Sequence, residues 1–236
     1  MQCWGLLRLW RRSSSRSAAG GVLSRIARIR VYLLYNTAAS QEGHFTTAQA
    51  AAAGYSPQLL AKYLKSRRIL RVLRGIYRLV HFPAGEHEDL VVIWLWTQCH
   101  GVFSHETALM LHELSDALPA RAHVTLPTEW SARRLRVPEG VTLYFSPTPE
   151  SERTWVGAVP ATSVTRTLVD CAKARVAPDL VRDAFEEAAS RGLVIRESIR
   201  PEVLQYLKQF FSIARSRVVW PSRGAWIGRG RPRMST

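Results

Sequence analysis

One stretch of the chain carries side chains suited to reading DNA. Gln58, Lys62 and Lys65 lie four and three residues apart, so a helix over this stretch places all three on one face. A glutamine amide can pair with adenine and a lysine ammonium with guanine, and both can reach phosphate oxygens. The same pattern also suits an ordinary solvated helix face. The charge of the surrounding segments decides between the two interpretations.

That surrounding charge is strongly positive, because residues 46–80 contain seven basic residues and no acid. The helix is followed by a predicted hairpin whose turn is Arg74-Gly75, which pairs Leu73 with Ile76 and sets Arg71 directly opposite Arg78. Like charges placed there repel, and with no acid nearby a phosphate backbone is the natural counter-charge. The predicted DNA-binding residues are Ser56, Gln58, Lys62, Lys65, Arg67, Arg68, Arg71, Arg74 and Arg78.

Two other patterns invite a catalytic interpretation. Ser104-His105-Glu106 contains the letters of a hydrolase triad, but consecutive helical residues point about 100° apart and should not form a hydrogen-bonded relay. We expect Ser104 to be a helix N-cap instead. Arg166 and Asp170 have the (i, i+4) spacing of a structural ion pair. No catalytic residue is therefore predicted, and the protein is predicted not to be an enzyme.

Neither metal nor cofactor binding is predicted. The histidines lack the His-x₃-His spacing of a helical metal site, and no glycine-rich phosphate loop is present. Cys3, Cys99 and Cys171 are odd in number and have no CxxC spacing, which favours the reduced cytoplasm, with Cys99 and Cys171 as small core residues. The apolar run from Leu90 to Trp96 is too short to cross a bilayer and is predicted to be core. The histidines concerned are His81, His87, His100, His105, His112 and His123.

The elements that must position the basic stretch follow from helix and turn signals. Apolar residues at helical spacing predict a helix over 23–39 that ends before Gly43. Thr46-Thr47 caps a short helix over 48–53, and Ser56-Pro57 opens another that runs to about Arg67. With the hairpin over 69–80, this order predicts a winged helix-turn-helix at residues 23–80.

The sequence outside residues 23–80 predicts a second domain at 81–200 and a basic segment at each end of the chain. Helices are expected over 86–99, 104–114, 162–174 and 178–191, and strands over 124–127 and 141–145, so the fold class is α+β. This domain has twelve basic and sixteen acidic residues, unlike the basic first domain, which suggests different partners. Residues 1–22 and 201–236 are basic and predicted to be disordered, adding only non-specific DNA affinity. The leader also has the composition of a transit peptide.

Several short motifs resemble those of the AbiEi family, the antitoxins of type IV toxin–antitoxin systems. In the first domain they are His44-Phe-Thr-Thr-Ala-Gln-Ala50, Gly54-Tyr-Ser56 and Leu73-Arg-Gly-Ile-Tyr-Arg-Leu79. In the second they are Phe103-Ser-His-Glu-Thr-Ala-Leu109, His123-Val-Thr-Leu-Pro127 and Thr162-Ser-Val-Thr-Arg-Thr-Leu-Val-Asp170. Each motif is short, but their order along residues 23–195 makes the resemblance specific.

The resemblance implies a function in two parts. A winged helix of this family represses its operon by binding inverted repeats in double-stranded DNA. The C-terminal domain assists DNA binding and counters a nucleotidyltransferase-like toxin without needing a stable complex. We therefore expect a cytoplasmic repressor and antitoxin with no membrane partner. The alternatives are a stand-alone winged-helix regulator without a toxin, or a degraded relative of a nuclease-fused AbiEi-like protein.

Overall fold

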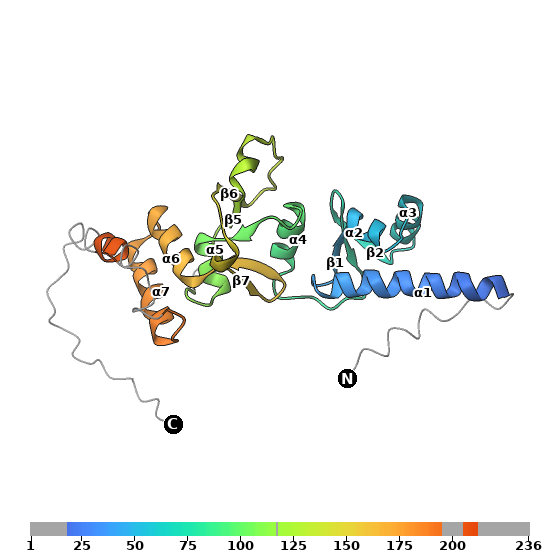
Figure 1. The fold of residues 1–236 in the computed structure, drawn as a ribbon, viewed down its shortest axis with the longest axis horizontal. Coiled ribbons are helices and arrows are strands. Elements are labelled where there is room, and N and C mark those ends of the chain that lie inside the picture. The colour runs from blue at the N-terminus through green and yellow to red at the C-terminus, as the bar shows by residue number, and fades with distance from the viewer. Residues whose placement is uncertain (1–17, 117, 195–204, 212–236) are drawn as a thin grey trace, which may run out of the picture. The chain divides into compact units, whose positions relative to one another are not determined.

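The computed structural model describes residues 18–116, 118–194 and 205–211 (Figure 1). The chain has both helices and strands, as the predicted α+β class requires. In chain order the elements are α1 (Ala18–Ala39), β1 (His44–Thr46), α2 (Thr47–Ala52), α3 (Pro57–Lys65), β2 (Ile69–Leu73), β3 (Ile76–Leu79), α4 (Glu88–Trp96), β4 (Val102–Phe103), α5 (His105–Leu111), β5 (Ala122–Leu126), β6 (Val141–Phe145), β7 (Arg153–Val156), β8 (Val159–Thr162), α6 (Val164–Lys173) and α7 (Pro178–Ser190), with short 3-10 helices at Thr128–Ala132 and Glu150–Glu152.

The elements from α1 to β3, residues 18–79, form a winged helix. The helices α1, α2 and α3 are followed by the β2–β3 hairpin, and β1 completes an antiparallel sheet in the order β1-β3-β2. Strand β1 was not predicted, because three residues are too few to show an alternation of apolar and polar side chains. The helices and sheet share one apolar core of Leu34, Ala38, Phe45, Ala50, Ala53, Tyr55, Leu60 and Ile69.

Local signals fix where these helices begin and end. The Thr46 hydroxyl accepts a hydrogen bond from Gln49 N, and the Gln49 side chain accepts one from Thr46 N at 2.8 Å, a complete capping box. Ser56 caps α3 by accepting from Leu59 N at 3.2 Å, and Pro57 occupies the first helical position. Gly43, just beyond α1, has φ +84°, a conformation that favours glycine. The predicted starts of α2 and α3 and the end of α1 are therefore confirmed. Helix α1 begins at Ala18 and not near residue 23, so the prediction of a disordered leader over 1–22 is wrong for residues 18–22.

The pairing predicted for the hairpin is only partly right. Leu73 pairs with Ile76 as expected, but a bulge between Arg71 and Leu73 shifts the register. Arg71 therefore lies opposite Tyr77, and Leu70 lies opposite Arg78. The predicted Arg71–Arg78 opposition is wrong, because an extra residue on one strand displaces every pair beyond it.

A five-stranded sheet follows, in the order β6-β5-β4-β8-β7. Strands β5 and β6, which pair in parallel, confirm the two predicted strands, whereas β4, β7 and β8 are only two to four residues long and were missed. Helix α4 is shorter than the predicted 86–99, but five of its residues are buried, so the run Leu90–Trp96 is core as predicted. No helix in the described ranges is long and apolar enough to span a membrane.

Helices α5, α6 and α7 form a separate core with a segment near the C-terminus. Leu109, Leu168, Val181 and Phe185 are buried in it, and Leu207 is 1% exposed in the same core. Residues 205–211 are helical, so the prediction of a disordered tail from 201 is wrong for this segment. Leu207, Phe210 and Phe211 give the segment an apolar side to bury, which the basic composition obscured. Most of the leader and residues 212–236 lie outside the described residues.

Internal packing divides the chain differently from the predicted boundary near residue 80. Among the described residues, one compact unit contains 18–103 and 121–161, and the other contains 104–116, 118–120, 162–194 and 205–211. The first unit therefore combines the winged helix, α4 and the five-stranded sheet, while the second is helical. A boundary placed where composition changes does not find this division, because the chain leaves the first unit and returns to it.

The two cysteines in the described part lie in different surroundings. Cys171 is buried, as predicted, and burial raises the pKa of its thiol. Cys99 is exposed, so its predicted place in the core is wrong. It lies beyond the end of α4, where Gln98 and Cys99 both have positive φ angles and the chain turns out of the helix.

Candidate nucleic-acid interface

Helix α3 presents one continuous polar stripe to solvent. Gln58, Lys62 and Lys65 are all exposed, and Ala61 is exposed between them. Leu60, on the opposite side, is 4% exposed, and Tyr63 and Leu64 pack against the same core. The predicted outward face of this helix is therefore confirmed as a surface.

Several contacts hold that face in one orientation. Ser56 and Pro57 fix the first turn of α3, and Leu60 fixes its rotation about the axis. The Tyr63 ring lies 5.8 Å from the Tyr55 ring, between centroids, and the Arg68 guanidinium lies 5.5 Å from the centre of the Tyr63 ring. A helix held at both ends can keep its side chains in register with a rigid ligand.

The basic residues after α3 continue the positive surface. Arg67, Arg68, Arg71 and Arg74 are all exposed, and Arg67 has a φ of +53° where the chain leaves the helix. In the described part of the chain, no ion pair is formed by Lys62, Lys65, Arg67, Arg71 or Arg74. Cations without protein partners are the groups that a phosphate backbone neutralises best.

The turn of the hairpin is tied to the helix-turn-helix. Gly75 O accepts hydrogen bonds from Thr47 N at 2.9 Å and from the Thr47 hydroxyl at 3.2 Å. Thr47 is the first residue of α2, and Gly75 has φ +82° at the tip of the turn. These bonds join Arg74 to the helices, so the wing is positioned before any ligand arrives.

Arg78 does not belong to this free set. Its Nη2 lies 2.6 Å from Glu88 Oε1 on α4, and it also donates to Phe82 O at 3.2 Å. The expectation that Arg78 has no acid nearby is therefore wrong. Glu88 is only ten residues from Arg78 in the sequence, just beyond the acid-free run. The sequence alone does not show that the chain returns to β3 after this run.

His44 lies on β1 opposite Arg78, and it is 1% exposed. Burial lowers the pKa of His44, and the Arg78 charge adds to this, while Glu88 and the carbonyls of Gln41 and Glu42 act against it. Burial raises the pKa of Glu88, but hydrogen bonds from Arg78 and Gly85 N, with the Arg78 charge, outweigh this and leave the pKa lowered. At pH 7 Glu88 is therefore ionised beside the Arg78 guanidinium, and His44 is neutral.

We expect the protein to lose stability as pH falls below about 6.5, the pKa of an unfolded histidine. Burial also lowers the pKa of His112, and Arg191 adds to this, although the His112 Nε2–H donates to Thr162 O at 2.7 Å. Below that pH the unfolded chain therefore binds more protons than the folded one. The free energy of unfolding falls by at most about 1.4 kcal/mol per pH unit for each histidine. Urea unfolding at pH 7.5 and pH 5.5 measures the change.

Replacing both histidines in His44→Gln, His112→Gln provides the control for that titration. The double variant should unfold with a smaller difference between the two pH values than the natural protein shows. An equal difference in both proteins would mean that other groups cause the acid sensitivity.

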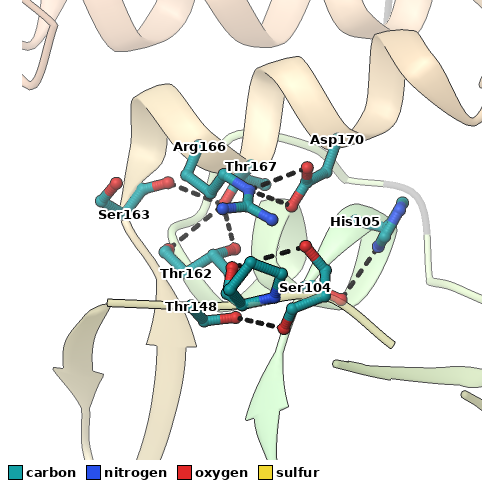
Figure 2. Close-up of polar contacts among 10 residues, drawn as sticks. Ser104, His105, Thr148, Thr162, Ser163, Arg166, Thr167 and Asp170 are labelled. Atoms are coloured by element: carbon teal, nitrogen blue, oxygen red, sulfur yellow. Dashed lines mark hydrogen bonds and ion pairs between the residues drawn. The ribbon is translucent and has the colours of Figure 1, made fainter. Parts of the chain in front are cut away.

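Ser104 and His105, the first two residues of the hydrolase-like motif, are buried among other polar side chains (Figure 2). Ser104 Oγ lies 2.9 Å from His105 Nδ1, so two of the three residues do hydrogen-bond, although successive helical positions were expected to keep them from forming a relay. The reason is that Ser104 is extended and His105 has a positive φ of 52°, so they are not two successive helical residues. Ser104 takes the N-cap position, but its hydroxyl makes no capping bond.

The rest of this cluster has a structural explanation. Arg166 Nε lies 2.9 and 2.8 Å from the two Asp170 oxygens, which confirms the predicted ion pair on α6 (Figure 2). The Thr167 hydroxyl lies 2.7 Å from that of Thr162, and neither residue is exposed. Ser104 is likewise 0% exposed, so its hydroxyl is out of reach of a substrate. We assign no chemistry to it.

Metal and small-molecule sites receive little support elsewhere. Within the ranges described, no group of three histidine, cysteine or acidic side chains could hold a metal ion. A hollow beside Trp94 and Trp155 has a volume of about 90 Å³. Pockets that enclose small molecules are usually about 300 Å³ or more. The exposed stripe of α3 and the basic residues after it remain the strongest candidate site.

Comparison with known proteins supports the winged helix. Residues 33–80 match the family described as "Transcriptional regulator, AbiEi antitoxin", which confirms the resemblance over that segment. The crystal structure of the RV2827C protein from Mycobacterium tuberculosis is 16% identical, with 77% of this chain and 75% of that chain covered at a TM-score of 0.43. None of the curated proteins matches the chain. The matched family is one of regulators, and the matched residues include all nine predicted DNA-binding residues.

Proposed function

From the match of residues 33–80 to a family of AbiEi transcriptional regulators, we propose that this protein represses transcription by binding DNA and acts as the antitoxin of a type IV toxin–antitoxin system. The observation that carries the DNA-binding half is the exposed stripe of α3. It lies in a run, residues 43–85, without a single acidic residue. The proposed ligand is double-stranded DNA in the cytoplasm.

The site residues take different roles in this proposal. Gln58, Lys62 and Lys65 face the major groove, where a helix of this size fits. Arg67, Arg68, Arg71 and Arg74 bind phosphates on either side of it. Ser56 fixes the start of the helix through its bond to Leu59 N. Arg78 is left out of the contact set, because Glu88 already neutralises it.

The antitoxin half rests on the family description and on charge. Residues 81–200 have an excess of four acidic residues, which favours a partner other than DNA for part of this region. The proposed partner is a nucleotidyltransferase-like toxin. Inverted repeats in the operator, and neutralisation without a stable complex, are what the family resemblance implies.

Binding to the DNA upstream of the protein's own reading frame tests the first half. Fluorescence anisotropy with that duplex, against a scrambled duplex of equal length, should show tighter binding to the natural sequence. Typical repressors prefer their operator by about a thousandfold or more at physiological salt. A reporter gene behind the same DNA should be repressed when the protein is expressed. Equal affinity for both duplexes would contradict the repressor role.

Co-expression tests the second half. The full chain should restore growth to cells that express a nucleotidyltransferase-like protein encoded beside it. Growth that stays blocked, together with operator binding, would favour the stand-alone regulator. Because the winged helix, α4 and the sheet share one compact unit, the full chain is the proper material for this test.

A further inference from the structure

The stripe on α3 contains one small residue among its polar ones. Ala61 is exposed three residues after Gln58 and directly before Lys62, about 100° around the helix from the buried Leu60. Ala61 was not among the predicted DNA-binding residues, because a lone alanine on a solvated helix face shows no chemistry in the sequence. Its position on a helix that enters the major groove gives its methyl group a specific use.

Position along the helix orders the side chains that meet the groove. Gln58 lies in the first turn of α3, and the first residues of a recognition helix are those that reach base edges. Ala61 lies about 4.5 Å further along the axis, since each residue rises about 1.5 Å. Successive bases on a strand are about 3.4 Å apart. On a helix that lies along the groove, Gln58 and Ala61 would therefore face neighbouring base pairs.

The chemistry of the two side chains limits which bases they can read. A glutamine amide matches adenine through N6 and N7, and an alanine methyl contacts the C5-methyl group of thymine. Lys62 and Lys65 lie on the same stripe nearer the end of the helix, where an ammonium can reach guanine or phosphate. Along the helix, Gln58 would therefore contact adenine, Ala61 would contact thymine, and the two lysines would contact the next base pair or its phosphates.

We propose that Gln58 and Ala61 determine sequence specificity by reading an adenine and a neighbouring thymine methyl group in the major groove. This inference rests on the proposed DNA-binding function and adds the base class that the site selects. The contacts that hold α3, through Ser56, Pro57 and Leu60, provide the fixed orientation that such reading needs. The exposed arginines after α3 then supply affinity without selecting a sequence.

Selection from a pool of duplexes with a randomised centre provides the test. The natural protein should enrich sites with an adenine beside a thymine-bearing pair. Gln58→Ala should lose the adenine preference and bind the selected site about 5- to 100-fold more weakly. Gln58→Glu should change the preference from adenine to cytosine, because a carboxylate accepts from cytosine N4. An acidic residue in the first turn also suits the helix, so this variant should stay folded.

The thymine contact has its own measurement. Replacing the selected thymine by uracil removes only the C5-methyl group and should weaken binding by the natural protein about fourfold. Ala61→Gly should bind the thymine and uracil duplexes equally. Arg74→Ala is the matched control, because it should weaken binding to all duplexes and leave the selected sequence unchanged.

The outcomes separate this inference from the function on which it rests. If sites are enriched but Gln58→Ala, Gln58→Glu and the uracil duplex leave preference and affinity unchanged, specificity lies elsewhere and the inference is overturned. If the natural protein enriches no sequence from the pool, sequence-specific DNA binding itself is contradicted.

Discussion

Replacing Lys62, Arg71 and Arg74 together with alanine is expected to weaken DNA binding about a hundredfold at roughly 0.15 M salt, because three phosphate contacts are lost. These side chains are exposed and have no acidic partner among the described residues, so their charge is available to DNA. The slope of log Kd against log salt concentration should decrease by about 2.7, since each phosphate contact contributes about 0.9 to it. Anisotropy titrations over a range of salt concentrations measure both quantities.

A variant with the same net charge distinguishes local contacts from overall attraction. Arg134, Arg136 and Lys173 are also exposed, and they lie outside the winged helix. Replacing these three with alanine should change the salt dependence much less. If the two triple variants lose affinity equally, the positive charge acts at a distance and the assignment of the interface to residues 46–80 is contradicted.

Gly43→Ala is expected to destabilise the protein by about 2 to 5 kcal/mol, which is large beside the net stability of a domain. Gly43 has φ +84°, where an added Cβ is strained, and that Cβ would lie 2.7 Å from Phe82 Cβ. Phe82 cannot rotate away, because its Cβ is fixed by the backbone. Urea unfolding, followed by circular dichroism, measures the loss.

Gly75→Ala is the matched control within the same winged helix. Gly75 has nearly the same φ, +82°, but an added Cβ would meet nothing nearer than the Thr47 hydroxyl at 3.6 Å. Only the backbone strain remains, which costs about 1 to 2 kcal/mol. Equal losses in the two variants would show that the contact with Phe82 is relieved by a small shift of the chain.

The winged helix was predictable from sequence because its signals are local. Ser56-Pro57 fixes the start of α3, and helical periodicity separates Leu60 from Gln58 and Lys62. Arg74-Gly75 marks the turn of the hairpin, which the pairing of Leu73 with Ile76 confirms. Each of these features depends on residues within one turn of helix or hairpin, so the local sequence is sufficient to predict it.

Features that depend on distant contacts were missed. A bulge in β2 displaced Arg71 from Arg78, and the return of the chain after Phe82 brought Glu88 to Arg78. The positive φ of His105 allowed a bond to Ser104 that helical geometry forbids. Register, chain return and unusual backbone angles are set by tertiary packing, which overrides the local pattern.

Two contacts link the winged helix to the residues that follow it: Arg78 with Glu88, and His87 N with Glu42 at 3.2 Å. They limit which gene segments can be exchanged by recombination without loss of a contact. A recombination event that transferred the gene segment only as far as residue 80 would leave Arg78 without its acid and Glu42 without its donor. A segment extending through α4, to Trp96, transfers both partners of each contact. The unit that can move between genes intact is therefore longer than the DNA-reading motif, and new combinations should preserve α4 together with the winged helix before it.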